Sequence, residues 1–366
     1  MSISVPHLQG VFLSLGGANR NFSEAEWANE FAAMRRVGIT FAAVRAALSG
    51  TSNSTKGGCV LGTFNAYYPT TLTPTGCYTP LPANPEGDYT LRRLLAGAAK
   101  NAVRVHITPA MPHSPFAWPH QPVESYFGAL ADLQANAFAD LWTVYPEYRS
   151  TIVGVYTALE EWNSVGWTKY NQSLAECYLE PLAARARNIS GPGTQLQIWA
   201  SPYYVGNLTL HPTALTARDY AAYWKRVWQL SPAFDWIALQ DSRGWQGNSD
   251  QEVAAALTEL REAARASGRP LWSNVELFEG WPQPCMYPTQ CGRHPAPIHR
   301  IVKQLANEDP FVEGRHVAWE WGSCLSPYTN ADTAALYHDY AAYVSGTSPV
   351  PPLTDSATPG LPPHTD

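Results

Sequence analysis

Three carboxylates follow apolar, strand-like runs of this sequence. Glu160 follows "TIVGVYTAL", Glu276 follows "RPLWSNV", and Asp241 follows "FDWIALQ". Two carboxyl groups held close together can do acid–base and nucleophilic chemistry, because one donates a proton while the other, ionised, attacks carbon or activates water. The question is therefore which of these side chains meet at one site.

The alternation of side chains along a strand predicts which carboxylates point inward. One face of the first run carries Gly154, Tyr156, Ala158 and Glu160, and the other carries Val153, Val155, Thr157, Leu159 and Glu161. The small and polar series suits the interior of a barrel, whereas the apolar, β-branched series suits a layer beneath helices. We therefore expect Glu160 to face inward and Glu161 to face outward.

The other two strand ends are interpreted in the same way. Trp272, Asn274 and Glu276 share one face, so Glu276 is also expected to face inward. Gln240 and Asp241 must point in opposite directions, and the sequence leaves open which of them reaches the site.

Strand-like runs alternate with helix-period segments along the whole chain. The eight runs span residues 10–15, 39–46, 102–110, 151–160, 195–204, 234–241, 269–279 and 316–323. This alternation predicts an α/β fold, a single (β/α)8 TIM barrel over residues 1–346, followed by a Pro-rich irregular tail over 347–366. Three long loops, 48–88, 111–123 and 280–297, follow strand ends, on the face where barrel enzymes build their sites.

Two carboxylates at the mouth of a barrel are the minimum set for cleaving a glycosidic bond. We assign Glu160 as general acid/base and Glu276 as nucleophile of a retaining reaction. Arg45 ends the second strand, either as the cation that keeps one carboxylate ionised or as part of a buried ion pair. If Asp241 points inward, an inverting reaction with Glu160 becomes the alternative, which needs carboxyl groups about 6.5–9.5 Å apart rather than about 5 Å.

Polar and aromatic side chains near the same strand ends are candidate sugar ligands. These residues are His106, Asn274, Tyr203, Tyr204, Trp162, Trp245, Trp281 and Trp321. Indole rings suit the C–H faces of sugars, and hydroxyl and amide groups suit their hydroxyls. His106 is equally well explained as a core histidine. On the eighth strand we favour Trp319 and Trp321 as inward residues over Glu320.

On these residues the chain resembles a large clan of retaining TIM-barrel glycoside hydrolases. That clan carries its acid/base glutamate at the end of strand four and its nucleophile at the end of strand seven, where Glu160 and Glu276 stand. Arg45 matches an arginine common on strand two, and Trp319 or Trp321 matches a frequent strand-eight tryptophan. The chain also resembles a poorly characterised TIM-barrel family of unknown function with acids at strands four, six and seven.

One departure from the clan is visible next to Glu160. The clan usually has asparagine immediately before its acid/base residue, and Leu159 stands there. The contact that this asparagine makes with the sugar 2-hydroxyl must come from another group, or the chain belongs to a different family on the same scaffold.

Composition excludes several other classes of protein. A net charge of −6 and a pI near 5.9 provide no basic surface for nucleic acid. No apolar run is long enough for a membrane span. The chain lacks HExxH, P-loop and GxGxxG motifs, so we expect no metal and no cofactor, and a monomer whose partner is a carbohydrate. Two alternatives stay open: a barrel that only binds glycans, and a metal-dependent hydrolase using His106, His113 and Asp241.

Cysteines and glycosylation sequons indicate an oxidising, extracellular location. Cys59 and Cys77 flank one loop, and Cys285 and Cys291 flank another, so each pair is expected to form a disulfide. Cys177 and Cys324 either form a long-range bridge or are free thiols. Five Asn-x-Ser/Thr sequons begin at Asn21, Asn53, Asn171, Asn188 and Asn207. We therefore expect a secreted glycoprotein.

Overall fold

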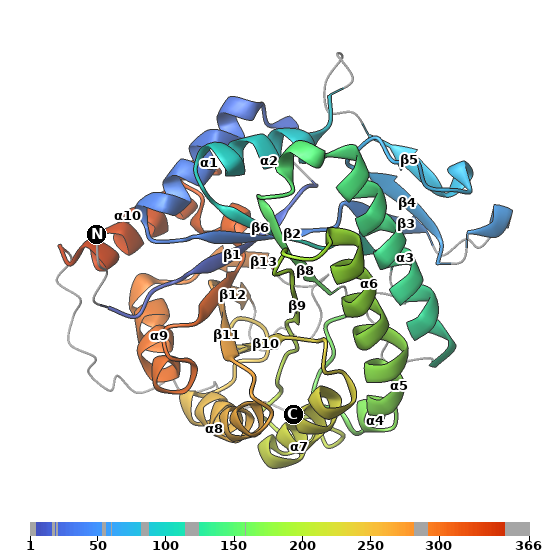
Figure 1. Ribbon diagram of the computed structural model, residues 1–366. Coiled ribbons are helices and arrows are strands. Elements are labelled where there is room, and N and C mark those ends of the chain that lie inside the picture. The colour runs from blue at the N-terminus through green and yellow to red at the C-terminus, as the bar shows by residue number, and fades with distance from the viewer. Residues whose placement is uncertain are drawn as a thin grey trace, which may run out of the picture.

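Eight parallel strands close into a barrel with helices around it (Figure 1). The computed structural model describes residues 5–347, except 17–18, 20, 53–55, 60, 82–87, 114–123, 158 and 282–291. The barrel strands are β1 (Gly10–Ser14), β2 (Phe41–Arg45), β6 (Arg104–Ile107), β8 (Ile152–Tyr156), β9 (Gln197–Ala200), β10 (Trp236–Gln240), β11 (Leu271–Glu276) and β14 (His316–Trp319). The predicted (β/α)8 barrel is thereby confirmed, and the Pro-rich tail lies outside the described residues from 348 onward.

Helices follow the strands and cover the outside of the barrel. The longer ones are α1 (Glu24–Arg36), α2 (Thr90–Lys100), α3 (Glu124–Val144), α6 (Glu180–Ser190), α7 (Ala217–Leu230), α8 (Asp250–Ala266), α9 (Ile298–Val312) and α10 (Ala331–Ser345). Ser23 caps α1, and Glu26 completes a capping box with it. Short segments α4 (Val165–Thr168) and α5 (Asn171–Ser173) precede a π-helical turn that leads into α6.

The long loops after β2, β6 and β11 form small sheets of their own. Strands β3 (Leu48–Ser52), β4 (Thr63–Ala66), β5 (Tyr78–Pro80) and β7 (Ala110–Met111) make one sheet, and β12 (Phe278–Trp281) pairs with β13 (Gly292–Pro295). The first sheet projects beside α3 (Figure 1).

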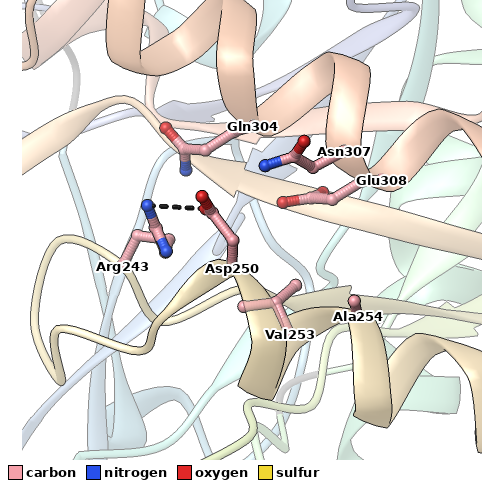
Figure 2. A pocket seen from close by; sticks show the side chains of 7 residues that line it. All are labelled: Arg243, Asp250, Val253, Ala254, Gln304, Asn307 and Glu308. Carbon is pink, nitrogen blue, oxygen red and sulfur yellow. Dashed lines mark ion pairs between the residues drawn. The ribbon is translucent and has the colours of Figure 1, made fainter. Parts of the chain in front are cut away.

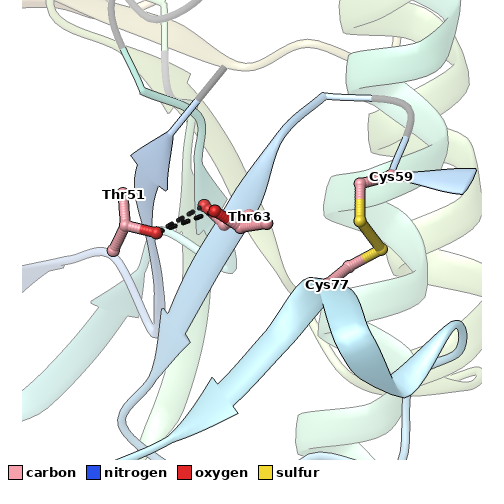
Figure 3. The surroundings of a disulfide bond; sticks show 4 residues. All are labelled: Thr51, Cys59, Thr63 and Cys77. Atoms are coloured by element: carbon pink, nitrogen blue, oxygen red, sulfur yellow. Dashed lines mark hydrogen bonds between the residues drawn. A yellow bond between two sulfur atoms is a disulfide. The ribbon is translucent and has the colours of Figure 1, made fainter. Parts of the chain in front are cut away.

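The sheet beside α3 carries the predicted disulfide. Cys59 and Cys77 are bonded next to β4, where the hydroxyl of Thr51 donates to the carbonyl of Thr63 across 3.1 Å (Figure 3). Cys177 and Cys324 are free thiols, so the long-range bridge does not form. The expected pair Cys285 and Cys291 lies outside the described residues.

Aromatic rings fill the interior of the barrel. Trp236 stacks on Trp199 with ring centroids 4.3 Å apart and on Trp272 at 4.8 Å. Glycine makes room for this packing: a Cβ on Gly154 would lie 2.0 Å from Nδ1 of His106. The interior is therefore a packed floor, and chemistry must take place above it, at the carboxyl ends of the strands.

Candidate active site

Glu160 lies beyond the end of β8 on the inner side of the barrel. Its Oε1 accepts a 2.7 Å hydrogen bond from the hydroxyl of Tyr156, a ring of the aromatic floor. Nη2 of Arg45 is 4.0 Å from the same oxygen. Glu160 is 8% exposed, so solvent reaches it only at its edge. The predicted inward orientation is therefore what the structure shows.

Arg45 connects Glu160 to the far side of the mouth. Its guanidinium carbon lies 4.5 Å from the ring centroid of Trp319, a cation–π geometry, and its Nη2 is 3.3 Å from the sulfur of Met111. Trp319 is the register partner of Glu276 on the neighbouring strand. Arg45 therefore stands between the Glu160 side and the Glu276 side of the mouth.

Glu276 is the last residue of β11 and is 3% exposed. Its Oε2 accepts hydrogen bonds from the main-chain amides of Gly244 at 2.6 Å and Trp245 at 3.2 Å. Burial, and then the charge of Asp241, raise the pKa of Glu276 to about 8, while the two amides and the Arg300 guanidinium act in the opposite direction. The site thus holds a buried carboxyl that titrates well above its ordinary range.

Asp241 points away from the mouth. Its carboxylate accepts from the side chain of Gln304 on α9 and from the main-chain amide of Glu276. Gln240 takes the inner position, where its Nε2 donates to the carbonyl of Ser201 across 2.6 Å. The possibility that Asp241 faces inward is therefore wrong, because alternation places it with Ile237 and Leu239 in the outer layer. An inverting pair of Glu160 with Asp241 has no geometric support.

Glu161 faces outward, as alternation predicts. It is 1% exposed and lies near Tyr220 and Tyr223 of α7, whose hydroxyl pKa values are raised mainly by burial and further by Glu161 when it is ionised. Burial, with a smaller contribution from the charge of Glu160, raises the pKa of Glu161 to about 8. Glu161 is therefore a protonated acid between the barrel and its helices at neutral pH, not a group of the mouth.

Two of the predicted aromatic ligands pair beside Glu160. The rings of Trp162 and Tyr203 are nearly parallel, 8° apart, with centroids separated by 6.2 Å. Burial is the main cause that raises the pKa of Tyr203, and the charge of Glu160 adds to it. Trp162 and Tyr203 are both partly exposed, so they form a candidate stacking surface for a sugar ring.

Trp245 lies on the Glu276 side of the mouth, with a residue that the sequence did not single out. The guanidinium of Arg293 sits over the rings of Trp245 at 4.5 Å and Phe278 at 4.9 Å. Arg293 belongs to β13, inside a predicted loop where no periodicity could indicate its direction.

Three other candidates do not reach the mouth. His106 is buried in the barrel interior, where its Nδ1 accepts from Nε1 of Trp199 across 3.0 Å and burial lowers its pKa to about 3. Tyr204 packs on Tyr220 in the outer layer. Trp321 donates from Nε1 to Oε2 of Glu30 across 2.6 Å, beneath α1. The alternation of side chains along a strand does not indicate how deep a residue lies in the barrel, and it no longer applies beyond the end of the strand.

The remaining candidates are Asn274 and Trp281. Asn274 faces inward and is fully buried, and its Nδ2 donates to Oγ of Ser201 across 2.8 Å. It is therefore part of the floor beneath the carboxylates rather than an open ligand. The side chain of Trp281 lies outside the described part of the chain.

The described residues contain neither a metal cluster nor a membrane-spanning helix. Within the described ranges, no group of three or more His, Cys, Asp or Glu side chains could hold a metal ion. The alternative metal set with His106 and Asp241 is not assembled, since one is in the barrel interior and the other is outside the strands. None of the described helices is long and apolar enough to cross a membrane.

Solved structures with the same architecture are TIM-barrel glycoside hydrolases. A proposed alpha-L-fucosidase from Bacteroides thetaiotaomicron VPI-5482 has a TM-score of 0.67 and 18% identity, covering 94% of this chain and 96% of that one. A GH113 beta-1,4-mannanase has a TM-score of 0.55 and 11% identity, covering 93% and 99%. The catalytic domain of a Paenibacillus polymyxa beta-amylase has a TM-score of 0.53 and 9% identity, covering 94% and 100%.

The fold is therefore that of the TIM-barrel glycoside hydrolases, and the expected resemblance is confirmed at this level. More particularly, the chain belongs to the family described as Domain of unknown function (DUF4434), which matches residues 8–331. A search of curated proteins finds no match.

Proposed function

We propose that this protein is a glycoside hydrolase that cleaves a poly- or oligosaccharide by a retaining mechanism. Glu160 is the general acid/base and Glu276 the nucleophile. In such a reaction the acid protonates the leaving oxygen while the nucleophile forms a covalent glycosyl-enzyme, which water then hydrolyses with the first residue acting as base.

The observation that carries this proposal is the placement of Glu160 and Glu276 above one aromatic floor. Glu160 is hydrogen-bonded to Tyr156, and Glu276 follows Trp272 on the same face of β11; both rings contribute to that floor. Because the strands are parallel, both carboxyl groups stand at the same end of the barrel. Trp162 with Tyr203, and Trp245, supply aromatic surfaces beside the pair.

Separate Glu160→Gln and Glu276→Gln variants test this proposal. We expect each to lose glycan cleavage by about 10²–10⁴-fold, because each removes one half of the acid–base chemistry. The matched control is Glu147→Gln, an exposed residue outside the barrel mouth. Cleavage products are quantified from a panel of plant, algal, fungal and bacterial polysaccharides, with circular dichroism to verify folding. A barrel that only binds glycans predicts binding without cleavage in the unsubstituted protein.

The pKa of Glu276 bears directly on the roles of the two acids. A nucleophile must be ionised, yet burial raises the pKa of Glu276 to about 8, so near neutral pH most of it is protonated. The main-chain amides of Gly244 and Trp245 supply the donors that an ionised Glu276 needs. With Glu276 as nucleophile, the reaction should therefore favour mildly alkaline pH.

The reverse assignment, with Glu276 as acid and Glu160 as nucleophile, is favoured by one observation. Arg45 and the hydroxyl of Tyr156 both face Oε1 of Glu160, and both stabilise a negative charge there. Azide rescue on an aryl glycoside with a good leaving group separates the two assignments. The acid/base variant yields a glycosyl azide of retained configuration, whereas the nucleophile variant yields the inverted one.

Secretion is part of the proposal and is supported by the surface of the chain. The Cys59–Cys77 bond needs an oxidising compartment. Three sequon asparagines, Asn21, Asn188 and Asn207, are exposed, as glycosylation requires. Expression in a secreting eukaryotic host tests this point: a mass shift removed by glycosidase treatment is expected, and unmodified sequons would remove this support.

A further inference from the structure

A buried acid pair lies behind Glu276, between the sheet and α9. Asp241 is 1% exposed and Glu308 is 2% exposed. The carboxyl of Glu308 lies next to Asp241 and Ser273. Asp241 accepts from three donors, whereas Oε2 of Glu308 has no hydrogen-bond partner among the described residues. Two ionised carboxylates side by side in a buried position repel each other, so this arrangement favours a proton on Glu308.

Asp241 links this acid pair to the candidate active site. Its Oδ1 accepts from the main-chain amides of Glu276 at 3.3 Å and Arg243 at 3.2 Å, and its Oδ2 accepts from the side chain of Gln304. Arg243 immediately precedes Gly244, whose amide donates to the carboxylate of Glu276. One carboxylate thus holds both the strand end that carries Glu276 and the turn that binds its side chain.

A small cavity adjoins the acid pair between α8 and α9. Figure 2 shows Gln304 and Glu308 on its α9 side, near the 2.8 Å ion pair of Arg243 with Asp250. Within the described residues, Oε1 of Gln304 and Oε2 of Glu308 are buried without a hydrogen-bond partner. The cavity has a volume of about 10 Å³, which is room for about one water molecule.

We propose that Asp241 and Glu308 share one proton, held on Glu308, and that this acid pair positions Glu276 for the reaction. Asp241 is a positioning residue, because it acts through the main chain of Glu276 and the Gly244 turn and does not reach the mouth. The catalytic half of this inference rests on the proposed function, whereas the shared proton does not depend on it.

The acid pair carries one negative charge, which acts on Glu276. That charge favours the protonated form of Glu276, so removing it should lower the pKa of this carboxyl. Other charged or titratable groups face the pair from the neighbouring elements: Arg243, Asp250, Glu276, Arg300, Lys303 and, through Ser273, His316. All of them are present in both variants described next, so a difference between these variants reports on the pair itself.

Asp241→Asn and Glu308→Gln are matched isosteric substitutions with opposite expectations. Glu308→Gln removes the proton-bearing group but keeps the charge of Asp241, to which the new amide can donate. Asp241→Asn removes the charge and leaves a protonated Glu308. Infrared spectra at neutral pH are recorded in a Glu276→Gln background, so that a change in the protonation of Glu276 adds no signal. They should lose the carbonyl stretch of one protonated carboxyl in Glu308→Gln and retain it in Asp241→Asn. An unchanged carboxyl band in Glu308→Gln would overturn the shared proton.

Kinetics test the positioning role on the same variants. Asp241→Asn should lower kcat by about 10²-fold with little change in KM, and should move the pH limb governed by Glu276 to lower pH. Glu308→Gln should leave that limb in place. An Asp241→Asn variant with wild-type kcat and pH profile would overturn the positioning role.

The experiments distinguish an error in the proposed function from an error in this inference. If the unsubstituted protein cleaves no glycan, infrared spectroscopy still decides the shared proton. Amide hydrogen exchange decides the positioning, since Glu276 and Gly244 amides should exchange faster in Asp241→Asn. If Asp241→Asn does not fold, Glu308→Gln alone tests the inference. This variant should lose the carboxyl band and keep slow exchange of the Glu276 and Gly244 amides. A failure of either expectation would overturn the inference.

Discussion

The hydroxyl of Tyr156 donates a 2.7 Å hydrogen bond to Oε1 of Glu160, four residues further along the chain. Tyr156 is fully buried in the barrel floor. The floor thus determines where Glu160 stands, because the ring is fixed by packing and the carboxylate is fixed by the ring's hydroxyl. The same oxygen faces Arg45 at 4.0 Å.

Tyr156→Phe should keep the packing and remove this donor. We expect kcat to fall about 10-fold or more, since a hydrogen bond to a charged group contributes about 1.5–3 kcal/mol. Kinetics on the best glycan substrate provide the measurement. Tyr145→Phe is the control, because the Tyr145 hydroxyl has no hydrogen-bond partner among the described residues. Equal activity in both variants would mean that Glu160 is positioned by other groups.

The pH–rate profile should contain a limb near pH 8 that belongs to Glu276, whose pKa burial raises to about 8. If Glu276 is the nucleophile, activity rises as pH increases through this value, because the active form is ionised. If Glu276 is the acid, activity falls through the same range. A profile of kcat/KM without any limb between about pH 7 and 9 would contradict the raised pKa in the free protein.

Glu161→Gln should stabilise the protein only at higher pH. The folded pKa of Glu161 is raised to about 8, so folding favours its protonated form. The stability that protonated Glu161 gives the folded protein is fully present below its unfolded pKa near 4.5. This stability is lost as pH rises toward 8, by up to about 1.4 kcal/mol per pH unit. Urea unfolding at pH 4.5 should show equal stability of the variant and the unsubstituted protein. At pH 9 the variant should be the more stable of the two. A pH-independent difference would contradict burial of this carboxyl.

Gly154→Ala should destabilise the barrel. The new Cβ would lie 2.0 Å from Nδ1 of His106 and 2.8 Å from the carbonyl oxygen of Gln197, so ring and strand must shift. We expect a loss of about 1–3 kcal/mol in the free energy of unfolding. Gly128→Ala in α3 is the control, where open space surrounds the position and alanine should stabilise the helix by about 0.5–1 kcal/mol. Chemical denaturation of both variants provides the comparison.

Loss of the Cys59–Cys77 bond should loosen the sheet beside α3. The bond closes a loop with a sequence separation of 18, for which the chain-entropy estimate is about 3 kcal/mol. A Cys59→Ser/Cys77→Ser variant should therefore show faster amide exchange and proteolysis in β4 and β5, with little effect on β8 and β11. Cys177→Ser, at an exposed free thiol, should behave like the unsubstituted protein. Unchanged exchange in β4 would show that packing alone holds this sheet.

Regular alternation explains which site residues were predictable. Glu160, Glu161 and Glu276 face the directions that a two-residue period assigns them, because each stands at or just beyond the end of an extended strand. Trp321 was assigned wrongly because β14 ends at Trp319 and the chain turns into a π-helical segment, Trp321–Leu325. The two faces before Asp241 are both largely apolar, so no contrast along the strand indicated its direction.

The sequence by itself determined the eight strand–helix units, and therefore the barrel and the end of it at which Glu160 and Glu276 both stand. It did so because periodicity and strand direction are local properties that parallel packing converts into a common end. Only the tertiary structure decided which strand-end groups touch: Arg45 beside Glu160, Arg293 over Trp245, and Asp241 paired with Glu308. Those contacts join segments far apart in the chain. The burial and electrostatic environment of each residue depend on neighbours that a local sequence pattern does not predict.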